Sequence, residues 1–258
     1  RQRQMCIRDR VNGENAADQG VGITEEISND LFNSGVDVIT TGNHVWDQKE
    51  TSDFIATEKR LLRPDNLIMG SPGKGFNIFD SKNNKKVAVI NLMGNIFMKK
   101  CDDVFEASKK FIEKYKLKVD FDFLIVDFHG EITSEKNAIG HYFDGKATLV
   151  IGTHTHIPTN DARILKNGTA YQTDAGMCGD YDSVIGGEKN KWIENFLIKP
   201  GFQKIKPASI NHTMCGVIIK VFEDTGLSSV AKQLILGLSL IHISEPTRLL
   251  SISYAVFC

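Results

Sequence analysis

Short apolar runs alternate with amphipathic segments along the middle of this chain, and this alternation limits the fold more than any other feature of its sequence. The runs at 36–40, 86–92, 121–128 and 148–152 are rich in β-branched residues and bounded by polar residues, which is typical of buried strands. Strands that alternate with helical segments favour an α/β fold. A turn between two extended segments and a strand-rich C-terminal part indicate mixed rather than purely parallel sheets.

Local signals predict where several of these elements begin and end. Residues 24–35 form a helix candidate with Thr24 as its N-cap, acidic residues in its first turn and Gly35 as its stop. Residues 105–116 place apolar side chains at helical spacing. Asp47 and Glu50 match a D-x-x-E capping box ahead of a short helix through Phe54 and Ile55. Residues 81–86 are typical of a hairpin turn.

Composition excludes several classes of protein. The chain has 258 residues, of which 41% are hydrophobic and 24% charged, as in globular proteins with a sizeable core. Its net charge of -1 gives no global electrostatic reason to bind nucleic acid or an anionic membrane. Five cysteines without C-x-x-C spacing indicate neither a disulfide framework nor a thiolate zinc site, so a cytoplasmic location is expected.

The two ends differ from the middle. Residues 1–10 are arginine-rich and form neither a signal peptide nor a strand, and residues 237–258 are apolar but too interrupted for a membrane-spanning helix. Both segments resemble translated adapter sequence and are expected to be non-native, which leaves 11–236 as the folded domain. The alternative is a native basic arm and a native pair of C-terminal strands.

Four segments concentrate side chains that can bind metals, and each is placed directly after a predicted strand. In α/β folds such loops meet beyond the carboxyl ends of the strands. Carboxylate, amide and imidazole groups without thiolate suit iron, manganese or zinc, and a carboxylate can bridge two such ions. Glu14 is the candidate for that bridge. The segments are 12–15, 42–44, 128–131 and 152–156, with Glu14, Asn43, His129, His154 and His156 as candidate ligands.

Each segment also has an ordinary structural interpretation when it is taken alone. Asn43 and His44 could form a turn, His129 could merely end a strand, and the histidines at 154 and 156 could be structural. Four such segments together favour a metal site. The remaining histidines, which lack this setting, are interpreted as structural or incidental: His141, His212 and His242.

These residues carry a family resemblance. Gly42-Asn43-His44 followed by Asp47, together with Gly152-Thr153-His154-Thr155-His156, resembles the GNH[DE] and GHxH signatures of calcineurin-like metallophosphoesterases. The longer segments NGENAA, TTGNHVWDQKE, DFHGEITSEK, VIGTHTHIPTNDARIL and GTAYQTDAGMCGDYDSVIG resemble the YmdB-like bacterial branch of that superfamily. The similarity runs in order through nearly all of 11–236.

The resemblance implies a β-sandwich flanked by helices, with two divalent metal ions, commonly iron, at a dinuclear site. It implies hydrolysis of 2′,3′-cyclic nucleotides by a metal-activated hydroxide. Glu14 would bridge the ions, His44 would protonate the leaving oxygen as the catalytic histidine, and Asn15 would lie beside the second ion. The other implied ligands are Asn43, His129 and His154 for one ion and His156 for the second.

One departure from the family pattern stands at the N-terminal end. The family begins with a strand that ends in a G-D-x-x-G loop, whose aspartate is a metal ligand, and a helix follows before the NGEN segment. Here NGEN starts at residue 12, and Asp9 lacks the glycine-flanked loop. The chain is therefore expected to lack the first strand and helix. We expect a weakened second metal site, unpaired strand edges and impaired activity.

Other functions remain open on the sequence alone. The same core could act as a phosphomonoesterase or protein phosphatase, or the chain could be a non-catalytic metal- or nucleotide-binding fragment. Residues 179–187, which include Tyr181, form either a loop near the site or a solvent-facing connection. The expected partner is a small phosphodiester or cyclic nucleotide, without a membrane or stable nucleic-acid binding, and a homo-oligomer is compatible with the sequence.

Overall fold

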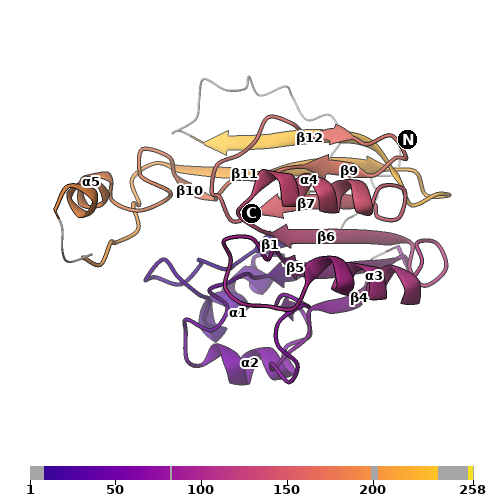
Figure 1. Cartoon of the computed structure of the whole chain (residues 1–258), viewed down its shortest axis with the longest axis horizontal. Coiled ribbons are helices and arrows are strands. Elements are labelled where there is room, and N and C mark those ends of the chain that lie inside the picture. Colours follow the sequence, from indigo (N-terminus) through magenta and orange to yellow (C-terminus); the bar gives the residue numbers. More distant parts are fainter. Residues whose placement is uncertain (1–8, 82, 199–202, 238–254, 258) are drawn as a thin grey trace.

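Two β-sheets face each other in the computed structural model, which describes residues 9–81, 83–198, 203–237 and 255–257 (Figure 1). The first has the order β10 (Gly179–Asp180), β11 (His212–Val221), β13 (Ala255–Phe257), β1 (Arg10–Asn12), β2 (Val38–Thr40) and β3 (Leu61–Leu62), and β12 (Ser228–Gly237) also pairs with β11. The second has the order β4 (Phe76–Asp80), β5 (Lys86–Met93), β6 (Phe123–His129), β7 (Leu149–Thr153), β9 (Ala170–Gln172) and β8 (Arg163–Ile164).

Both sheets contain parallel and antiparallel strands. In the second sheet β5, β6, β7 and β9 run parallel, whereas β4 and β8 are antiparallel to their neighbours. In the first sheet β1, β2 and β3 are parallel, and β11 pairs antiparallel with β10 and β12. The α/β sandwich and the mixed pairing expected from the sequence are confirmed.

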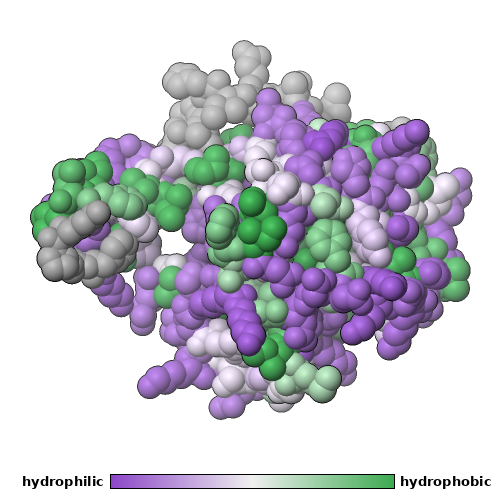
Figure 2. All heavy atoms as spheres, in the orientation of Figure 1, coloured by the Kyte–Doolittle hydropathy of each residue, from purple (hydrophilic) through white to green (hydrophobic). Residues whose placement is uncertain are grey.

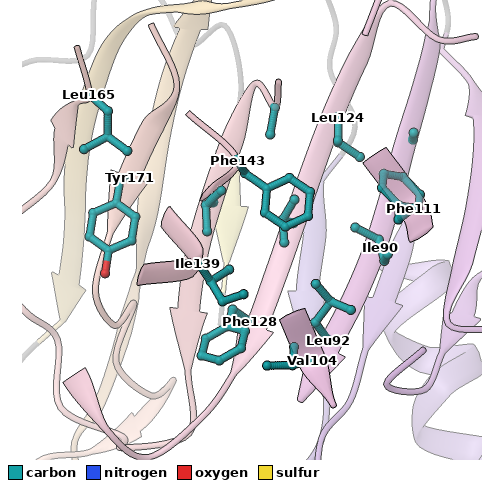
Figure 3. Packing of buried hydrophobic residues seen from close by; sticks show 14 of the residues in the cluster. Ile90, Leu92, Val104, Phe111, Leu124, Phe128, Ile139, Phe143, Leu165 and Tyr171 are labelled. Carbon is teal, nitrogen blue, oxygen red and sulfur yellow. The ribbon is translucent and has the colours of Figure 1, made fainter. Parts of the chain in front are cut away.

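Alternation along the strands divides the core into layers. In β5, Val87 and Val89 point between the two sheets, whereas Ile90 and Leu92 point outward beneath helices. Helices α3 (Val104–Lys114) and α4 (Thr133–Tyr142) cover that outer face, where Val104, Phe111 and Ile139 are buried (Figure 3).

The first sheet has its own outer layer. Ile39 of β2 and Leu61 of β3 lie beneath α1 (Glu25–Asn33) and α2 (Thr51–Thr57), where they pack with Ile55 of α2. The neighbouring residue Val38 faces the other sheet instead, as the period of two in a strand requires. Both faces of β2 are therefore buried, which explains why its residues form a continuous apolar run.

Helix α5 (Lys189–Leu197) lies apart from this body. It buries none of its residues, and Trp192 stacks on Phe196 with ring centroids 5.7 Å apart. Ile193, Phe196 and Leu197 are exposed, and Figure 2 shows hydrophobic side chains gathered over this helix.

Several local predictions are confirmed. The amide of Ile27 donates to the Thr24 hydroxyl at 3.2 Å, so Thr24 is the N-cap of α1, and Gly35 follows the helix with φ of 104°. The helix predicted at 105–116 is α3, with Asp103 as its N-cap. Strands β4 and β5 form the hairpin predicted around 81–86.

The capping box predicted ahead of α2 is wrong. The N-cap of α2 is Glu50, which makes no side-chain cap hydrogen bond, and its carboxylate instead accepts from the amide of Glu25 at 3.3 Å. Asp47 bonds His44 rather than the helix. Both acidic side chains therefore bond residues outside α2, and a local sequence pattern does not reveal such partners.

The ends of the chain also differ from the expectation. Arg10 begins β1, and Gly237 ends β12, although both were assigned to the terminal segments. Strand β13 lies between β1 and β11, parallel to β1, so β1 is paired on both sides. The unpaired edge expected beside β1 is therefore wrong. None of the helices in the described part of the chain has the length and apolar character of a membrane span.

Candidate metal centre

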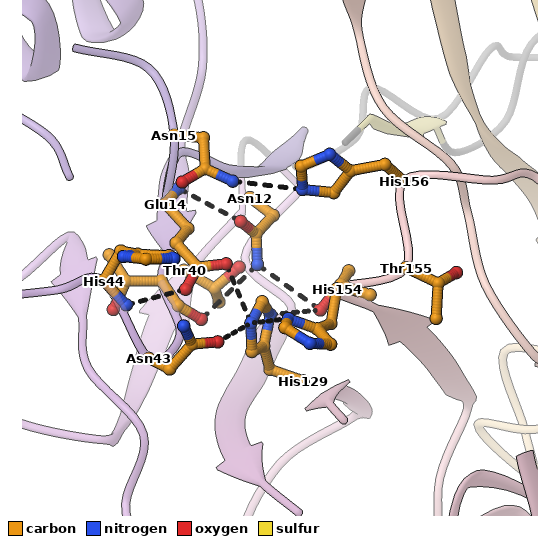
Figure 4. Close-up of polar contacts among 12 residues, drawn as sticks. Asn12, Glu14, Asn15, Thr40, Asn43, His44, His129, His154, Thr155 and His156 are labelled. Atoms are coloured by element: carbon orange, nitrogen blue, oxygen red, sulfur yellow. Dashed lines mark hydrogen bonds and ion pairs between the residues drawn. The ribbon is translucent and has the colours of Figure 1, made fainter. Parts of the chain in front are cut away.

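Four strand ends bring the candidate residues together. Asn12 at the end of β1 is in register with Thr40 at the end of β2, and His129 at the end of β6 is in register with Thr153 at the end of β7. The four segments singled out in the sequence continue from these ends and meet across the two sheets (Figure 4). Their predicted position after strands is confirmed.

The Nε2 atom of His129 is the centre of the tightest cluster. It lies 2.8 Å from Oε2 of Glu14, 2.9 Å from Oδ1 of Asn43 and 3.1 Å from Nδ1 of His154 (Figure 4). Glu14 and His129 are buried, and Asn43 is half-buried. Side chains from loops of both sheets thus converge on one point.

A buried hydrogen-bond chain orients the His129 ring. The Thr153 hydroxyl donates to Oδ1 of Asp127 at 2.8 Å, so its oxygen is free to accept from Nδ1 of His129, which lies 3.0 Å away. In the neutral imidazole this leaves the Nε2 lone pair facing the cluster. Asp127 is itself held by Arg10, whose Nη2 lies 2.8 Å from Oδ2, and by the Thr40 hydroxyl at 2.5 Å.

Sequence reasoning missed both Asp127 and Thr153. A usable signal was present for Asp127, because it precedes His129 by two residues in a strand and must share its face. A charged residue on the buried face of an apolar strand is expensive unless it is paired. Thr153 offered no such signal outside the GTHTH segment.

Glu14 is ionised in this setting. Burial alone would raise its pKa, but the charge and hydrogen bond of His129 outweigh burial and lower the pKa to about 2. Its other oxygen, Oε1, accepts the backbone amide of His44 at 2.8 Å. The carboxylate therefore contacts two different loops at once.

His154 presents Nδ1 to the cluster. Burial, followed by the positive charge of His129, lowers the pKa of His154 to about 4, so its ring is neutral at neutral pH. Nε2 lies 3.0 Å from the carboxylate of Glu131 and must donate to it. The Nδ1 lone pair is then directed at His129.

This donor set fits a metal ion. When the His129 ring is neutral, the oxygen atoms of Glu14 and Asn43 and one ring nitrogen each of His129 and His154 are all acceptors. Acceptors this close need a cation between them, which is either a metal ion or the extra proton that gives His129 its positive charge. Among the described residues, Glu14, His129 and His154 form a group of acidic and imidazole side chains whose ligand atoms all lie within 4.8 Å of one another. Carboxylate, amide and imidazole suit iron, manganese or zinc.

Asn15 and His156 form a separate pair, apart from the cluster around His129. Nδ2 of Asn15 lies 3.1 Å from Nε2 of His156, while the Oδ1 atom of Asn15 is buried without a hydrogen-bond partner. Nδ1 of His156 lies 2.8 Å from the carbonyl oxygen of Ile185, to which it must donate. The Nε2 lone pair therefore points toward Asn15, and a cation there could also satisfy the amide oxygen.

The segment 179–187, which begins with β10 and continues as a loop, lies at this pair. Besides the Ile185 contact, the Tyr181 hydroxyl lies 3.3 Å from the His156 carbonyl oxygen. The interpretation of this segment as a loop near the site is confirmed.

His44 is outside the cluster but next to it. Its Nδ1 lies 2.6 Å from Oδ2 of Asp47, and Oδ1 of Asp47 accepts from Lys99 at 3.3 Å. Burial raises the pKa of Asp47, but the hydrogen bond with His44 and the contact with Lys99 more than reverse this and lower it. The remaining ring nitrogen of His44 is then available to exchange a proton with a ligand.

The loop that carries the two histidines is held in an unusual conformation. His154 and His156 have φ of 104° and 65°. Lys136 and Asp174, both buried, hold the loop from beneath. The ammonium of Lys136 donates to the Thr153 carbonyl oxygen at 2.9 Å and to Asp174 at 2.5 Å, and Asp174 accepts the Thr155 amide at 3.1 Å.

Gly42 allows the two halves of the site to approach. A Cβ atom at this position would clash with the imidazole of His129. Among the other histidines, His141 lies on α4 and His212 on β11, both exposed, and His242 falls outside the described residues.

A family model described as YmdB-like protein matches residues 4–234. The chain is 44% identical, over 215 residues, to the 2′,3′-cyclic-nucleotide 2′-phosphodiesterase of Bacillus subtilis. The aligned region covers 83% of this chain and 80% of that protein. It is 40% identical to a putative phosphatase/phosphodiesterase of Mycoplasma genitalium, over 72% of this chain and 66% of the relative.

Two solved structures share the fold. A hypothetical protein from Thermus thermophilus superimposes with a TM-score of 0.80 at 38% identity, covering 88% of this chain and 86% of the other. A protein described as a novel phosphatase from Mycoplasma pneumoniae gives a TM-score of 0.79 at 33% identity, over 88% and 81% of the two chains.

Proposed function

Because this chain belongs to the YmdB-like protein family, we propose that it is a metal-dependent phosphodiesterase that hydrolyses 2′,3′-cyclic nucleotides. The convergence of three acceptor atoms on Nε2 of His129 is the observation that carries the proposal. Such a cluster concentrates positive charge once a cation binds, and a phosphodiester is the anion named for the Bacillus subtilis relative.

We propose that two divalent ions occupy the site, with Glu14 between them. Asn43, His129 and His154 would hold one ion, and Asn15 and His156 would hold the other. Iron is our first candidate, with manganese and zinc as alternatives, because the donors are oxygen and imidazole nitrogen. When bound, the ions would neutralise the phosphate and make water a stronger nucleophile.

In this proposal His44 is the general acid. The carboxylate of Asp47 binds Nδ1 and so directs Nε2 away from it, toward the space beside the cluster. A ring held in this way can deliver its proton to the leaving oxygen of the ester. The backbone amide of His44 also donates to Glu14, which holds the backbone of the proposed proton donor next to a proposed metal ligand.

The cellular setting follows from the same proposal. We propose a cytoplasmic enzyme that acts on a small anionic substrate. Cys101 and Cys215 are reduced in the part of the chain that the structure describes, which is compatible with this proposal.

Metal loading and substrate comparison test the proposal. The protein is loaded with iron, manganese or zinc, the bound metal per chain is measured, and hydrolysis of 2′,3′-cyclic nucleotides, nitrophenyl phosphate and phosphopeptides is compared. We expect metal-dependent hydrolysis with the cyclic nucleotides preferred. Preference for the monoesters would favour a phosphatase, as the name of the Mycoplasma genitalium relative allows. Tight nucleotide binding without any turnover would favour a binding protein.

A further inference from the structure

A small pocket opens beside the metal cluster, between three loops. It has a volume of about 160 Å³, and its lining includes Asn43, Trp46, Ile68, Met93 and Lys99. Five of the lining side chains are apolar and four are polar, the polar ones being Asn43, Ser71, Lys99 and Lys100. A slot with apolar walls and a few polar groups is typical of a ligand site.

The pocket and the metal cluster share residues. Asn43 lines the pocket and places its Oδ1 atom 2.9 Å from Nε2 of His129. Lys99 also lines the pocket, and it donates to Asp47, the residue that holds His44. A substrate whose phosphate lies at the cluster and at His44 would therefore have its organic part at the mouth of this pocket.

One wall of the pocket is tied to a neighbouring strand by hydrogen bonds. Asn66 ties the loop of residues 67–71 to the end of β5, because its side chain donates to the Met93 carbonyl oxygen at 2.7 Å and accepts the Met93 amide at 2.9 Å. Ile68 lines the pocket and is nevertheless 59% exposed. An exposed apolar side chain loses contact with water when a planar apolar group covers it.

A larger groove elsewhere suits an anion poorly. It has a volume of about 470 Å³ and lies along α3, where its lining includes Asp65, Asp102, Asp103 and Glu106. These carboxylates would repel a nucleotide phosphate, despite two lysines in the same lining. Size alone therefore does not identify the substrate-binding pocket.

We propose that the pocket lined by Trp46, Ile68 and Met93 binds the nucleobase of the substrate, while Lys99 and the metal centre face its ribose phosphate. This inference rests on the proposed function and adds to it the part of the substrate that is recognised. The volume accommodates one base and not a whole nucleotide, so the sugar and phosphate lie outside the pocket, next to His44. Contact through apolar walls predicts tolerance of different bases.

Kinetics with a matched pair of substrates test the inference. Adenosine 2′,3′-cyclic phosphate is compared with methyl riboside 2′,3′-cyclic phosphate, in which a methoxy group replaces the base. For Ile68→Ala we expect kcat/KM to fall roughly 10-fold for the nucleotide, as for the loss of a few methylene contacts, and to stay within about twofold for the riboside. The control Ile210→Ala, at a site that is 86% exposed and outside the pocket lining, should change neither.

Fluorescence provides a readout that does not depend on turnover. Trp46 and Trp192 are the two tryptophans, so Trp192→Phe leaves Trp46 as the single reporter. Adenosine, which carries no phosphate, should quench this emission, and adding Ile68→Ala should weaken its binding several-fold. Methyl riboside should not quench.

The outcomes separate the two proposals. If Ile68→Ala slows both cyclic phosphates equally, or adenosine leaves Trp46 emission unchanged, the base-binding inference is wrong while the phosphodiesterase proposal stands. If neither cyclic phosphate is hydrolysed by the metal-loaded protein, the proposed function fails, and the adenosine titration still decides whether the pocket binds a base.

Discussion

At the scale of single residues, hydrogen-bond partners set the orientation of the three imidazoles in and beside the cluster. His129 and His154 each have one ring nitrogen bound to a protein oxygen, which leaves the other directed into the cluster. His44 uses the same arrangement with Asp47 but lies beside the cluster. The roles that we propose for the three imidazoles, two metal ligands and one proton donor, follow from these partners.

Replacing His44 should separate catalysis from metal binding. We expect His44→Ala to lower kcat by roughly 10² to 10⁴-fold, the usual worth of a positioned general acid. Bound metal per chain should stay near the wild-type value, because the cluster contacts the backbone amide of His44 and not its ring. Steady-state kinetics and elemental analysis measure the two quantities. Unchanged turnover would remove His44 from the mechanism.

Asp47 should act through His44. Asp47→Asn keeps the shape of the side chain but removes its charge, so we expect kcat to fall about 10-fold or more, with a smaller change in KM. In a His44→Ala background the same substitution should have little further effect, because the ring that Asp47 orients is gone. Additive losses in the double variant would show an independent role for Asp47, and Lys99→Gln separates the lysine contact from the histidine contact.

At the scale of elements, the site depends on strand ends and the loops that continue from them. The β2 loop brings Gly42 against the His129 ring at the end of β6. The β7 loop carries both positive-φ histidines and is held by Lys136 from α4. These contacts join elements that are distant in the sequence.

Gly42 should be intolerant of any side chain. In Gly42→Ala the new methyl group would meet the His129 imidazole, so the loop or the ring must shift. We expect metal affinity to fall at least 10-fold, in line with losses around metal ligands. Gly179→Ala is the matched control, because a Cβ there meets nothing closer than 3.8 Å. Metal titration of both variants makes the comparison, and equal affinities would contradict the expectation.

Lys136 should stabilise the histidine loop through Asp174. Lys136→Met leaves a buried carboxylate without its cation, which typically costs about 3–5 kcal/mol in the free energy of unfolding. We expect Lys136→Met combined with Asp174→Asn to cost less than the sum of the two single changes, because the uncompensated charge is then absent. Urea unfolding of the four proteins measures this coupling. Strict additivity would show that the ion pair contributes nothing of its own.

At the scale of the whole molecule, the candidate metal centre connects the two sheets. Glu14 and Asn43 follow strands of the first sheet, whereas His129 and His154 come from the ends of strands in the second. An ion held by all four would link the sheets across the sandwich. Metal binding should therefore stabilise the fold and not only the site.

Metal removal should lower the melting temperature. At a free metal concentration of 100 times Kd, binding adds about 2.7 kcal/mol to the stability of the folded state. For a chain of this size that corresponds to a rise in Tm of roughly 5–10 °C. Thermal unfolding with metal and with a chelator measures the shift. His129→Gln should abolish most of it and Ile210→Ala should retain it, whereas equal shifts in both variants would place the stabilising ion elsewhere.

Much of the architecture could be predicted from local sequence. The strands at 86–92 and 121–128, the N-cap at Thr24 and the hairpin near residue 84 all follow from periodicity and turn chemistry, which depend on neighbouring residues. The D-x-x-E pattern failed at Asp47 because a partner outside the helix, His44, competes for the same carboxylate.

The sequence by itself determined the kind of fold and the side chains available for its site: an α/β sandwich with Glu14, Asn43, His129 and His154 following strand ends. Only the tertiary structure decided which atoms meet. It placed Asp127 and Thr153 behind His129, brought Ile185 to His156, and paired Ala255–Phe257 with β1. The physical reason is that strand periodicity is a local property, whereas pairing between strands and buried polar contacts join residues far apart in the chain.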